Sequence, residues 1–332
     1  MSYRKLVFDG GFGIDRLRVI DAADREPGHG EVRVRVDAAS LNRRDLLLVQ
    51  GIYNPKQKLP STPCSDAAGV IDAAGPGCSR LRAGQRVVVH MMPDWISGEI
   101  ARERIVTALG GADREGTAQQ YLVVPEETVV ALPDRVSIET AATLPCAALT
   151  AWSAITVLGQ VKPGDTVVIQ GTGGVSLFAL QFAKMSGARI IATTSSPERA
   201  QRLKELGADE VLNYRTDPRW SYHARELAGG RIDLVVDVAG GAFLDQSVRM
   251  VRAGGTVAMI GVLDGGKSEI TMPLAVMRQI CLQGVTAGNR EHFEQMLRAI
   301  VKHDVDPVID SRFALDDAPA AFQRMAENAH IG

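Results

Sequence analysis

Cysteine is scarce in this sequence, and its few cysteines do not form a pattern typical of metal binding. The 332 residues include four cysteines, and no two of them form a CxxC pair. The six histidines are scattered, so that no cluster of histidine and cysteine has the spacing of zinc ligands. Few and unpaired thiols favour a reducing compartment over a disulfide-stabilised secreted domain.

The sequence also lacks a long hydrophobic run and an excess of charge of one sign. No stretch approaches the roughly 20 apolar residues that a membrane-spanning helix needs, and the N-terminal segment MSYRKLVFDGG has no apolar core like that of a signal peptide. The formal net charge of −2 gives no electrostatic reason to expect nucleic acid or an anionic membrane as a partner. We therefore expect a cytoplasmic protein that acts on a small molecule.

The first part of the chain has the pattern of short strands separated by turns. Residues 31–36, EVRVRV, alternate between charged and apolar side chains, so one face of this strand should be buried. Further strands are expected at residues 70–74, 86–90, 119–124 and 128–132. Many short strands of this kind predict a barrel or a sandwich. The long segment 91–116, with a helix expected at 100–109, should shape a substrate pocket, because such segments are usually functional or disordered.

From Ile138 the pattern changes to helices that alternate with strands. Residues 138–158 are expected to be helical in two pieces, broken at Pro145. Strands are expected at residues 166–170, 189–194, 210–213, 233–238 and 256–262. This alternation predicts an α/β fold class with a doubly wound parallel sheet, the Rossmann fold. The apolar strand 256–262 could lie at the sheet edge, where it would pair two copies of the chain into a homodimer.

The expected domain organisation is discontinuous. Hydrophobic residues make up 45% of the chain, and its length suggests about two domains. After about Asn289 a long helix and a second helix from Ala318 are expected to return to the first domain. We therefore expect a catalytic domain of residues 1–137 and 289–332, interrupted by a nucleotide-binding domain of residues 138–288.

Residues 161–196 have the complete pattern of a strand, a glycine-rich turn, a helix and a second strand. Such a turn leaves backbone N–H groups and the positive end of the helix dipole available to a diphosphate. Gly171 would allow the tight turn and Gly173 the close approach of a pyrophosphate, whereas Ser176 stands where the pattern prefers a third glycine. The turn residues expected to contact a dinucleotide are Gly171, Thr172, Gly173, Gly174 and Val175.

The end of the second strand favours NADP(H) over NAD(H). An NAD site usually has an acidic residue there, but this sequence has only hydroxyl residues, including Ser195 and Ser196, followed by Arg199. Hydroxyls and a guanidinium would suit a 2′-phosphate. Alternatively, Ser195 or Ser196 caps the helix that starts at Pro197, with Glu198 completing a capping box, and both roles are compatible.

Several long motifs, taken in order along nearly the whole chain, resemble the medium-chain dehydrogenase/reductase superfamily, on its zinc-independent, quinone-oxidoreductase-like branch. They include AASLNRRDLLLVQGIY (38–53), PCSDAAGVIDAAGPG (63–77), GTAQQYLVVPEE (116–127), AATLPCAALTAW (141–152) and LKELGADEVLNYR (203–215), besides the glycine stretch. The resemblance implies a chaperonin-10-like barrel domain and a nucleotide-binding domain. It also implies a final barrel strand beyond Gly332, where this sequence stops.

The resemblance further implies that zinc is absent. Zinc-dependent members carry a cysteine, a histidine and acid pair, and a second cysteine as ligands of the catalytic metal. The matching positions here hold Asn42, Ser65 with Asp66, and Cys146. One thiol and one carboxylate are too few for a catalytic zinc site, and residues 91–116 lack the four cysteines that bind a second zinc in those members. Cys146 is then expected to be a buried thiol near the cofactor.

The resemblance also implies the positions of the site residues. Asn42, Asp45 and Tyr53 match the cleft that holds nicotinamide and substrate. Asn42 and Tyr53 could donate hydrogen bonds to a carbonyl oxygen, although Tyr53 could instead only stack on the substrate, and Asp45 is expected to position Asn42 or nearby backbone. Further cofactor contacts are implied for Thr150, Tyr214, Val238, Ala239, Gly240, Gly261, Val262, Leu263, Gly288, Asn289 and Arg290.

These expectations leave three functions open. The first is an NADPH-dependent reductase of a conjugated carbonyl, either a quinone or an enone, with the cofactor supplying the chemistry. The second is a zinc-independent alcohol dehydrogenase or aldehyde reductase on the same scaffold. The third is a protein that binds the cofactor without catalysis. Turnover of quinones and enones, compared with that of alcohols, would distinguish them.

Overall fold

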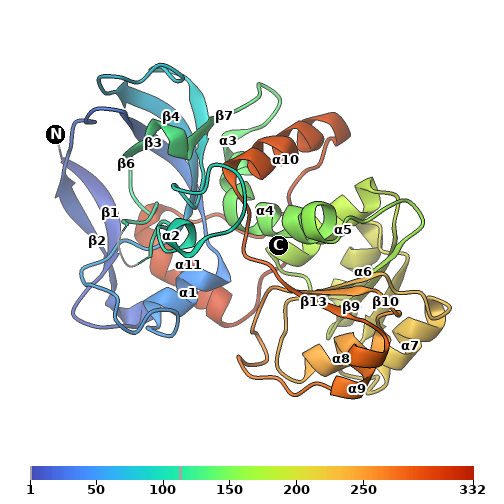
Figure 1. Cartoon of the computed structure of the whole chain (residues 1–332). Helices are drawn as coiled ribbons and strands as arrows, with labels where there is room; N and C mark the ends of the chain where they lie inside the picture. The colour runs from blue at the N-terminus through green and yellow to red at the C-terminus, as the bar shows by residue number, and fades with distance from the viewer. Residues whose placement is uncertain (1, 112–113) are drawn as a thin grey trace. The chain divides into compact units, whose positions relative to one another are not determined.

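The computed structural model describes residues 2–111 and 114–332, which divide into two compact units. The first unit, called the barrel unit here, comprises the chain up to Ala147 and Gly288–His330. The second, called the nucleotide unit, comprises Ala148–Ala287 and Ile331–Gly332. Both units appear in Figure 1, and each is described by itself. No helix of the described residues has the length and apolar composition that are needed to cross a membrane.

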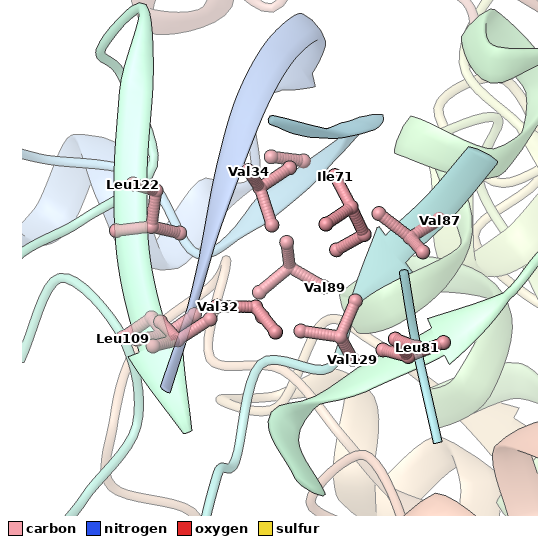
Figure 2. Close-up of a cluster of buried hydrophobic side chains, with 11 residues drawn as sticks. Val32, Val34, Ile71, Leu81, Val87, Val89, Leu109, Leu122 and Val129 are labelled. Atoms are coloured by element: carbon pink, nitrogen blue, oxygen red, sulfur yellow. The ribbon is translucent and has the colours of Figure 1, made fainter. Parts of the chain in front are cut away.

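The barrel unit is built on an antiparallel five-stranded sheet with the order β6-β3-β4-β5-β7. Its strands are β3 (Glu31–Ser40), β4 (Asp66–Ala74), β5 (Arg86–Val89), β6 (Tyr121–Pro125) and β7 (Val129–Ala131). A hairpin of β1 (Ser2–Phe8) and β2 (Leu17–Ala23) forms a separate sheet. The alternation predicted for residues 31–36 is confirmed: Val32 and Val34 are buried and meet Val89 in the interior, as Figure 2 shows.

A second apolar core joins the two ends of the chain within the barrel unit. Helix α1 (Arg43–Val49) and helix α11 (Ala318–Ala326) contribute Leu46 and Phe322, which pack with Phe8 of β1. Helix α11, one of the helices expected to return to the first domain, thus packs on elements from the start of the chain. Helix α10 (Arg290–His303) precedes it, and helix α2 (Arg102–Ile105) is much shorter than the helix expected at 100–109.

The nucleotide unit contains the predicted doubly wound sheet, so the fold class is confirmed. Six parallel strands have the order β10-β9-β8-β11-β12-β13. They are β8 (Thr166–Gln170), β9 (Arg189–Thr194), β10 (Glu210–Asn213), β11 (Leu234–Asp237), β12 (Thr256–Met259) and β13 (Cys281–Gly284). The helices that accompany the strands are α5 (Gly174–Met185), α6 (Pro197–Glu205), α7 (Trp220–Leu227), α8 (Phe243–Met250) and α9 (Met272–Met277). Val168, Val235 and Val257 from three neighbouring strands share one buried cluster.

The expected edge position of residues 256–262 is wrong. Strand β12 ends at Met259 and lies between β11 and β13, so β13 is the edge strand. The apolar pattern continues past Met259 because Val262 and Leu263 are apolar, yet both are more than half exposed in a loop. The sequence CLQG of β13 has few β-branched residues, which hid this strand from pattern analysis.

The expected break at Pro145 takes another form. Helix α3 (Ile138–Ala142) is followed by a π-helical stretch, Leu144–Ala148, and then by α4 (Leu149–Trp152) and a second π-helical stretch, Ser153–Leu158. Proline lacks an N–H and clashes with the carbonyl one turn earlier. Here the helix accommodates Pro145 by widening, which is the local change that π-helical turns provide.

Candidate functional site

The glycine turn between β8 and α5 has the geometry that a dinucleotide needs. Gly171 has φ +77°, a conformation that favours glycine. A Cβ added to Gly171 or Gly173 would meet no atom within 4 Å, so the space beside this backbone is open. Gly173 is the N-cap of α5, and no side chain caps this helix. The first N–H groups of a 12-residue helix are thus available to an anion, and the turn fits a pyrophosphate.

Ser176 explains how the turn tolerates a missing third glycine. Its side chain is buried, and its Oγ donates to the Gln170 carbonyl oxygen at 2.7 Å. The hydroxyl therefore ties the first turn of α5 to the end of β8. A small side chain with a satisfied hydroxyl permits the same close packing of helix and strand.

A buried polar network shapes the next loop of the sheet. Ser247 Oγ donates to Asp237 Oδ2 at 2.7 Å and accepts from Gln170 Nε2 at 2.9 Å. The other carboxylate oxygen of Asp237 accepts from the Ala239 and Gly240 N–H groups at 3.1 and 2.8 Å. Sequence analysis missed Gln170, Asp237 and Ser247, because only the fold brings these three strand and helix residues together.

Two predicted cofactor-contact segments, Val238–Gly240 and Gly261–Leu263, lie against each other. The Asp264 N–H donates to the Ala239 carbonyl oxygen at 2.8 Å. A Cβ on Gly261 would lie only 2.1 Å from the Val238 carbonyl oxygen. Glycine is therefore required at this position, because the two loops are in direct backbone contact.

Arg199, in the first turn of helix α6 after β9, contacts the glycine turn. Arg199 Nη1 donates to Thr172 Oγ1 at 3.4 Å. Ser196 is the N-cap of α6 and accepts from the Arg199 N–H at 3.3 Å, so the capping role weighed for this serine is present. The capping box with Glu198 is not formed, because Glu198 is one position too early in the helix and contacts the Ser196 hydroxyl instead. Ser195 follows β9 without this role.

The other residues expected near the cofactor are placed as follows. Thr150 is buried on α4, and Val175 is on the first turn of α5. Tyr214 follows β10 and packs edge-on against Phe243, with ring centroids 5.2 Å apart. These positions belong to the nucleotide unit, whereas Gly288, Asn289 and Arg290 belong to the barrel unit.

The segment from Gly288 to Arg290 is bonded to neighbouring parts of the barrel unit. Asn289 is the N-cap of α10, accepting from the His292 N–H at 2.8 Å, and its Nδ2 donates to the Gly98 carbonyl oxygen at 3.2 Å. The Arg290 N–H donates to the Trp95 carbonyl oxygen at 3.0 Å. His90 lies 3.1 Å from the Gly288 carbonyl oxygen, and burial lowers the pKa of this histidine to about 4. This segment therefore anchors the start of the long segment 91–116.

A second cluster of polar side chains lies at the start of α1 in the barrel unit. Asp45 is fully buried, and its Oδ2 accepts from the Asn42 N–H at 2.8 Å, the arrangement expected of a residue that positions Asn42. Burial raises the pKa of Asp45 to about 7, although the neighbouring Arg44 opposes this shift. The Asn42 amide nitrogen is buried beside the Asp45 and Asp66 carboxyl groups, and its interaction with them opposes the rise of both pKa values.

The same cluster contains the positions that match zinc ligands. Asp66 is fully buried and accepts from Ser65 Oγ at 2.7 Å and from the Cys146 N–H at 2.9 Å. Burial raises the pKa of the Asp66 carboxyl and that of the Cys146 thiol. Asn42 and Ser65 are not zinc ligands, and no group of three or more metal-binding side chains occurs among the described residues. These donors therefore do not fit a catalytic zinc ion.

A cation of the chain itself is part of this cluster. Arg44 Nη1 donates to Asp45 Oδ1 at 3.2 Å and to the Leu109 carbonyl oxygen at 3.0 Å. Its guanidinium lies over the ring of Tyr53, 5.4 Å from the centroid. Tyr53 is 57% exposed, whereas Asp45 is fully buried. The structure joins Asn42 to Asp45 by a hydrogen bond, and Tyr53 reaches this cluster through Arg44, a residue that sequence analysis missed.

Comparisons with known proteins agree with this architecture. Two family models match the chain, an alcohol dehydrogenase GroES-like domain over residues 28–134 and a zinc-binding dehydrogenase over residues 174–302. A zinc-type alcohol dehydrogenase-like protein of Schizosaccharomyces pombe is 36% identical over 340 residues, 100% of this chain and 98% of that protein. An acryloyl-coenzyme A reductase of Sulfurisphaera tokodaii is 26% identical and covers 94% of this chain and 93% of that protein. A solved structure described as an NAD-dependent alcohol dehydrogenase has a TM-score of 0.90 at 34% identity, covering 99% of this chain and 98% of that one.

Proposed function

Because the chain belongs to the medium-chain dehydrogenase/reductase superfamily, we propose that it is a zinc-independent, NADPH-dependent reductase of a conjugated carbonyl, a quinone or an enone. The observation that carries this proposal is the cluster at the start of α1. Where zinc-dependent relatives have metal ligands, this chain has Asn42 and Ser65, and the cluster contains the Arg44 cation. A site without a Lewis acid suits a substrate whose developing negative charge is spread by conjugation.

In the nucleotide unit, the residues of the glycine turn would hold the cofactor. The N–H groups at the start of α5 would bind the pyrophosphate, and the open space beside Gly171 and Gly173 would admit it. Arg199 and the hydroxyls at the end of β9 would bind the 2′-phosphate of NADPH. The bound cofactor supplies the hydride.

In the barrel unit, Asn42 and Tyr53 would orient the carbonyl oxygen and stabilise the charge that develops on it. We expect both side chains to contribute hydrogen bonds to the oxyanion rather than to deliver a proton. A quinone tolerates this arrangement, because its reduced anion is weakly basic and water can protonate it later.

The proposal is tested by turnover with a panel of carbonyl substrates. We expect NADPH oxidation with quinones or enones and weak activity with simple aldehydes. The second candidate is a zinc-independent alcohol dehydrogenase. The Schizosaccharomyces pombe relative, a zinc-type alcohol dehydrogenase-like protein, favours the alcohol dehydrogenase activity but not the absence of zinc. Efficient reduction of NADP⁺ by alcohols, with no activity toward quinones and enones, would select it.

We also propose that the chain forms a homodimer through the edge strand β13. Its neighbour in the nucleotide unit, α9, exposes Met272, Val276 and Met277 by more than half of their surface. An unpaired strand edge next to exposed apolar side chains is a surface that pairing with a second copy would cover. Light scattering over a range of protein concentrations should give the mass of a dimer, and a monomer at every concentration would contradict it.

A further inference from the structure

Arg44 is buried at a position where its charge is only partly compensated. Its side chain is 11% exposed, and Nη1 donates to Asp45 Oδ1 and to the Leu109 carbonyl oxygen, while Tyr53 is a further hydrogen-bonding neighbour of the guanidinium. Asp45 and Asp66 lie nearby, but burial raises the pKa of both carboxyl groups. Among the described residues, no carboxylate or backbone carbonyl accepts from Nε or Nη2. A substrate oxygen could use these two donors.

Arg33 in the same unit shows what a fully compensated arginine looks like. Its side chain is 13% exposed and also lies over a tyrosine, with the Tyr121 ring centroid at 5.7 Å. Unlike Arg44, it uses Nε, Nη1 and Nη2, which contact three carboxylates at 2.6 to 3.0 Å, those of Asp24, Glu26 and Asp72. The two side chains have nearly the same exposed fraction and the same aromatic neighbour type, although Arg44 lies deeper in the protein than Arg33. They differ in how many of their N–H groups donate to acceptors of the protein.

We propose that Arg44 is a catalytic cation whose remaining N–H donors bind the carbonyl oxygen of the substrate. This inference rests on the proposed function and assigns a further residue to it. As the hydride forms a new C–H bond on the substrate, the π electrons move to the carbonyl oxygen, and the guanidinium stabilises the negative charge there. Arg44 keeps its proton, since arginine stays protonated in proteins, and water protonates the product oxygen afterwards.

The neighbours of Arg44 hold it in position for this role. The Leu109 carbonyl oxygen and Asp45 Oδ1 fix Nη1 from two different segments of the barrel unit. The Tyr53 ring fixes the plane of the guanidinium from the exposed side. A planar fork held at three points is a preorganised donor, which is the property that makes electrostatic stabilisation effective. Arg44 and Tyr53 would then present their donors to one substrate oxygen.

The test compares Arg44→Gln with the matched variant Arg33→Gln. We expect Arg44→Gln to lower kcat for a quinone or enone by about 100-fold or more, with NADPH binding unchanged by fluorescence titration. Arg33→Gln should lower the melting temperature and leave turnover near that of the wild type. Equal turnover in Arg44→Gln and the wild type, or an equal loss in both variants, would overturn the proposal.

Two further measurements keep the proposal testable if Arg44→Gln does not fold. In the double variant Arg44→Gln/Asp45→Asn, a neutral amide replaces the carboxyl group that the loss of Arg44 would leave unpaired. The turnover of this double variant is compared with that of Asp45→Asn alone. In Arg44→Gly, added guanidinium chloride should restore turnover, while ammonium chloride at the same ionic strength should not. Equal turnover in the first comparison, or recovery with both salts alike, would count against a catalytic guanidinium.

Anion binding separates this inference from the proposed function. Benzoate carries two oxygens that match a guanidinium fork, and its binding in the presence of NADP⁺ is measured by calorimetry. We expect Arg44→Gln to weaken benzoate binding at least tenfold and Arg33→Gln to leave it unchanged; the same affinity in both would overturn the role of Arg44. If the wild type does not turn over quinones or enones at all, the proposed function fails, while the benzoate result still decides whether Arg44 binds an oxyanion.

Discussion

The glycine turn of the nucleotide unit and the α1 cluster of the barrel unit offer different groups to a charged ligand. The turn offers backbone N–H groups beside open space, and no side chain caps the start of α5. The α1 cluster instead uses buried charged side chains, in which Arg44 and Asp45 constrain each other. A permanent anion such as a diphosphate can be bound by fixed backbone dipoles. A charge that exists only during a reaction requires donors that are already oriented before it appears.

This difference predicts which changes each region tolerates. The turn should be sensitive to added volume, because its function depends on empty space next to the backbone. The α1 cluster should be sensitive to the loss of a donor or a charge, because its function depends on side-chain groups. The predictions that follow test this distinction, from the largest expected effect on binding or turnover to the smallest, and the last concerns stability.

Adding one methyl group to the turn should have the largest effect. In Gly173→Ala the new Cβ meets no protein atom within 4 Å, and the φ of Gly173 is −79°, so the free energy of unfolding should hardly change. The methyl group would displace the pyrophosphate from at least two charge-assisted hydrogen bonds. This should cost about 3 kcal/mol, or more than a hundredfold in NADPH affinity. Fluorescence titration measures the affinity, and unchanged binding would contradict the assignment of the turn.

Removing a donor from the α1 cluster should affect turnover rather than cofactor binding. Asn42→Ala and Tyr53→Phe should each lower kcat for a quinone by about 100-fold, because each removes one hydrogen bond to the developing oxyanion. Each variant is assayed with a quinone and with an aldehyde. If Tyr53→Phe abolishes aldehyde reduction but spares quinone reduction, the phenol is a proton donor, and this result would favour the alcohol dehydrogenase function. If neither variant changes turnover, the assignment of Asn42 and Tyr53 to the substrate site is wrong.

Replacing Arg199 should distinguish the two cofactors. Arg199→Ala should weaken NADPH binding by roughly 1.5–3 kcal/mol, the contribution of a hydrogen bond to a charged group, and leave NADH binding nearly unchanged. Arg202→Ala, which removes an arginine of the same helix that pairs with Glu205, is the matched control. An equal loss for both cofactors in Arg199→Ala would mean that Arg199 only stabilises the turn through Thr172.

The pH dependence of stability should reveal the buried carboxyl of Asp45. Its pKa is raised from 3.8 to about 7 on folding, so its proton stabilises the folded state at low pH, and this contribution is lost as the pH rises from about 4 to about 7. The loss is up to about 1.4 kcal/mol per pH unit, tenfold in the folding equilibrium. Asp45→Asn should flatten this part of the profile in urea unfolding experiments. Identical pH profiles of stability for the wild type and Asp45→Asn would show that folding does not shift the pKa of Asp45.

Sequence analysis predicted best those features that depend on local backbone demands. The strands at 166–170, 189–194 and 210–213 have the predicted bounds. In the first two, Val- and Ile-rich runs between turn residues specify buried parallel strands. Gly171 was recognised for a similar reason, since its positive φ limits the choice of residue. Strand β12 was predicted too long, because apolar residues continue into the loop that follows it.

The features that sequence analysis missed depend on contacts between distant segments. An arginine in the sequence NRRD gives no sign of burial, and Arg44 becomes part of a cluster only because Leu109 and Tyr53 lie beside it. The network of Gln170, Asp237 and Ser247 is likewise assembled from two strands and a helix. A resemblance to known families indicates which positions matter, but the replacement of zinc ligands by another group changes the chemistry in a way that only the packing reveals.

The metal content of catalytically active protein tests the central claim most directly. The claim is that Asn42 and Ser65, which replace zinc ligands, leave a site that works without a metal. Elemental analysis of pure protein that reduces a quinone with NADPH should show zinc far below one atom per chain, and a chelator should leave the rate unchanged. One zinc per chain, with activity lost on chelation and restored by zinc, would contradict this account.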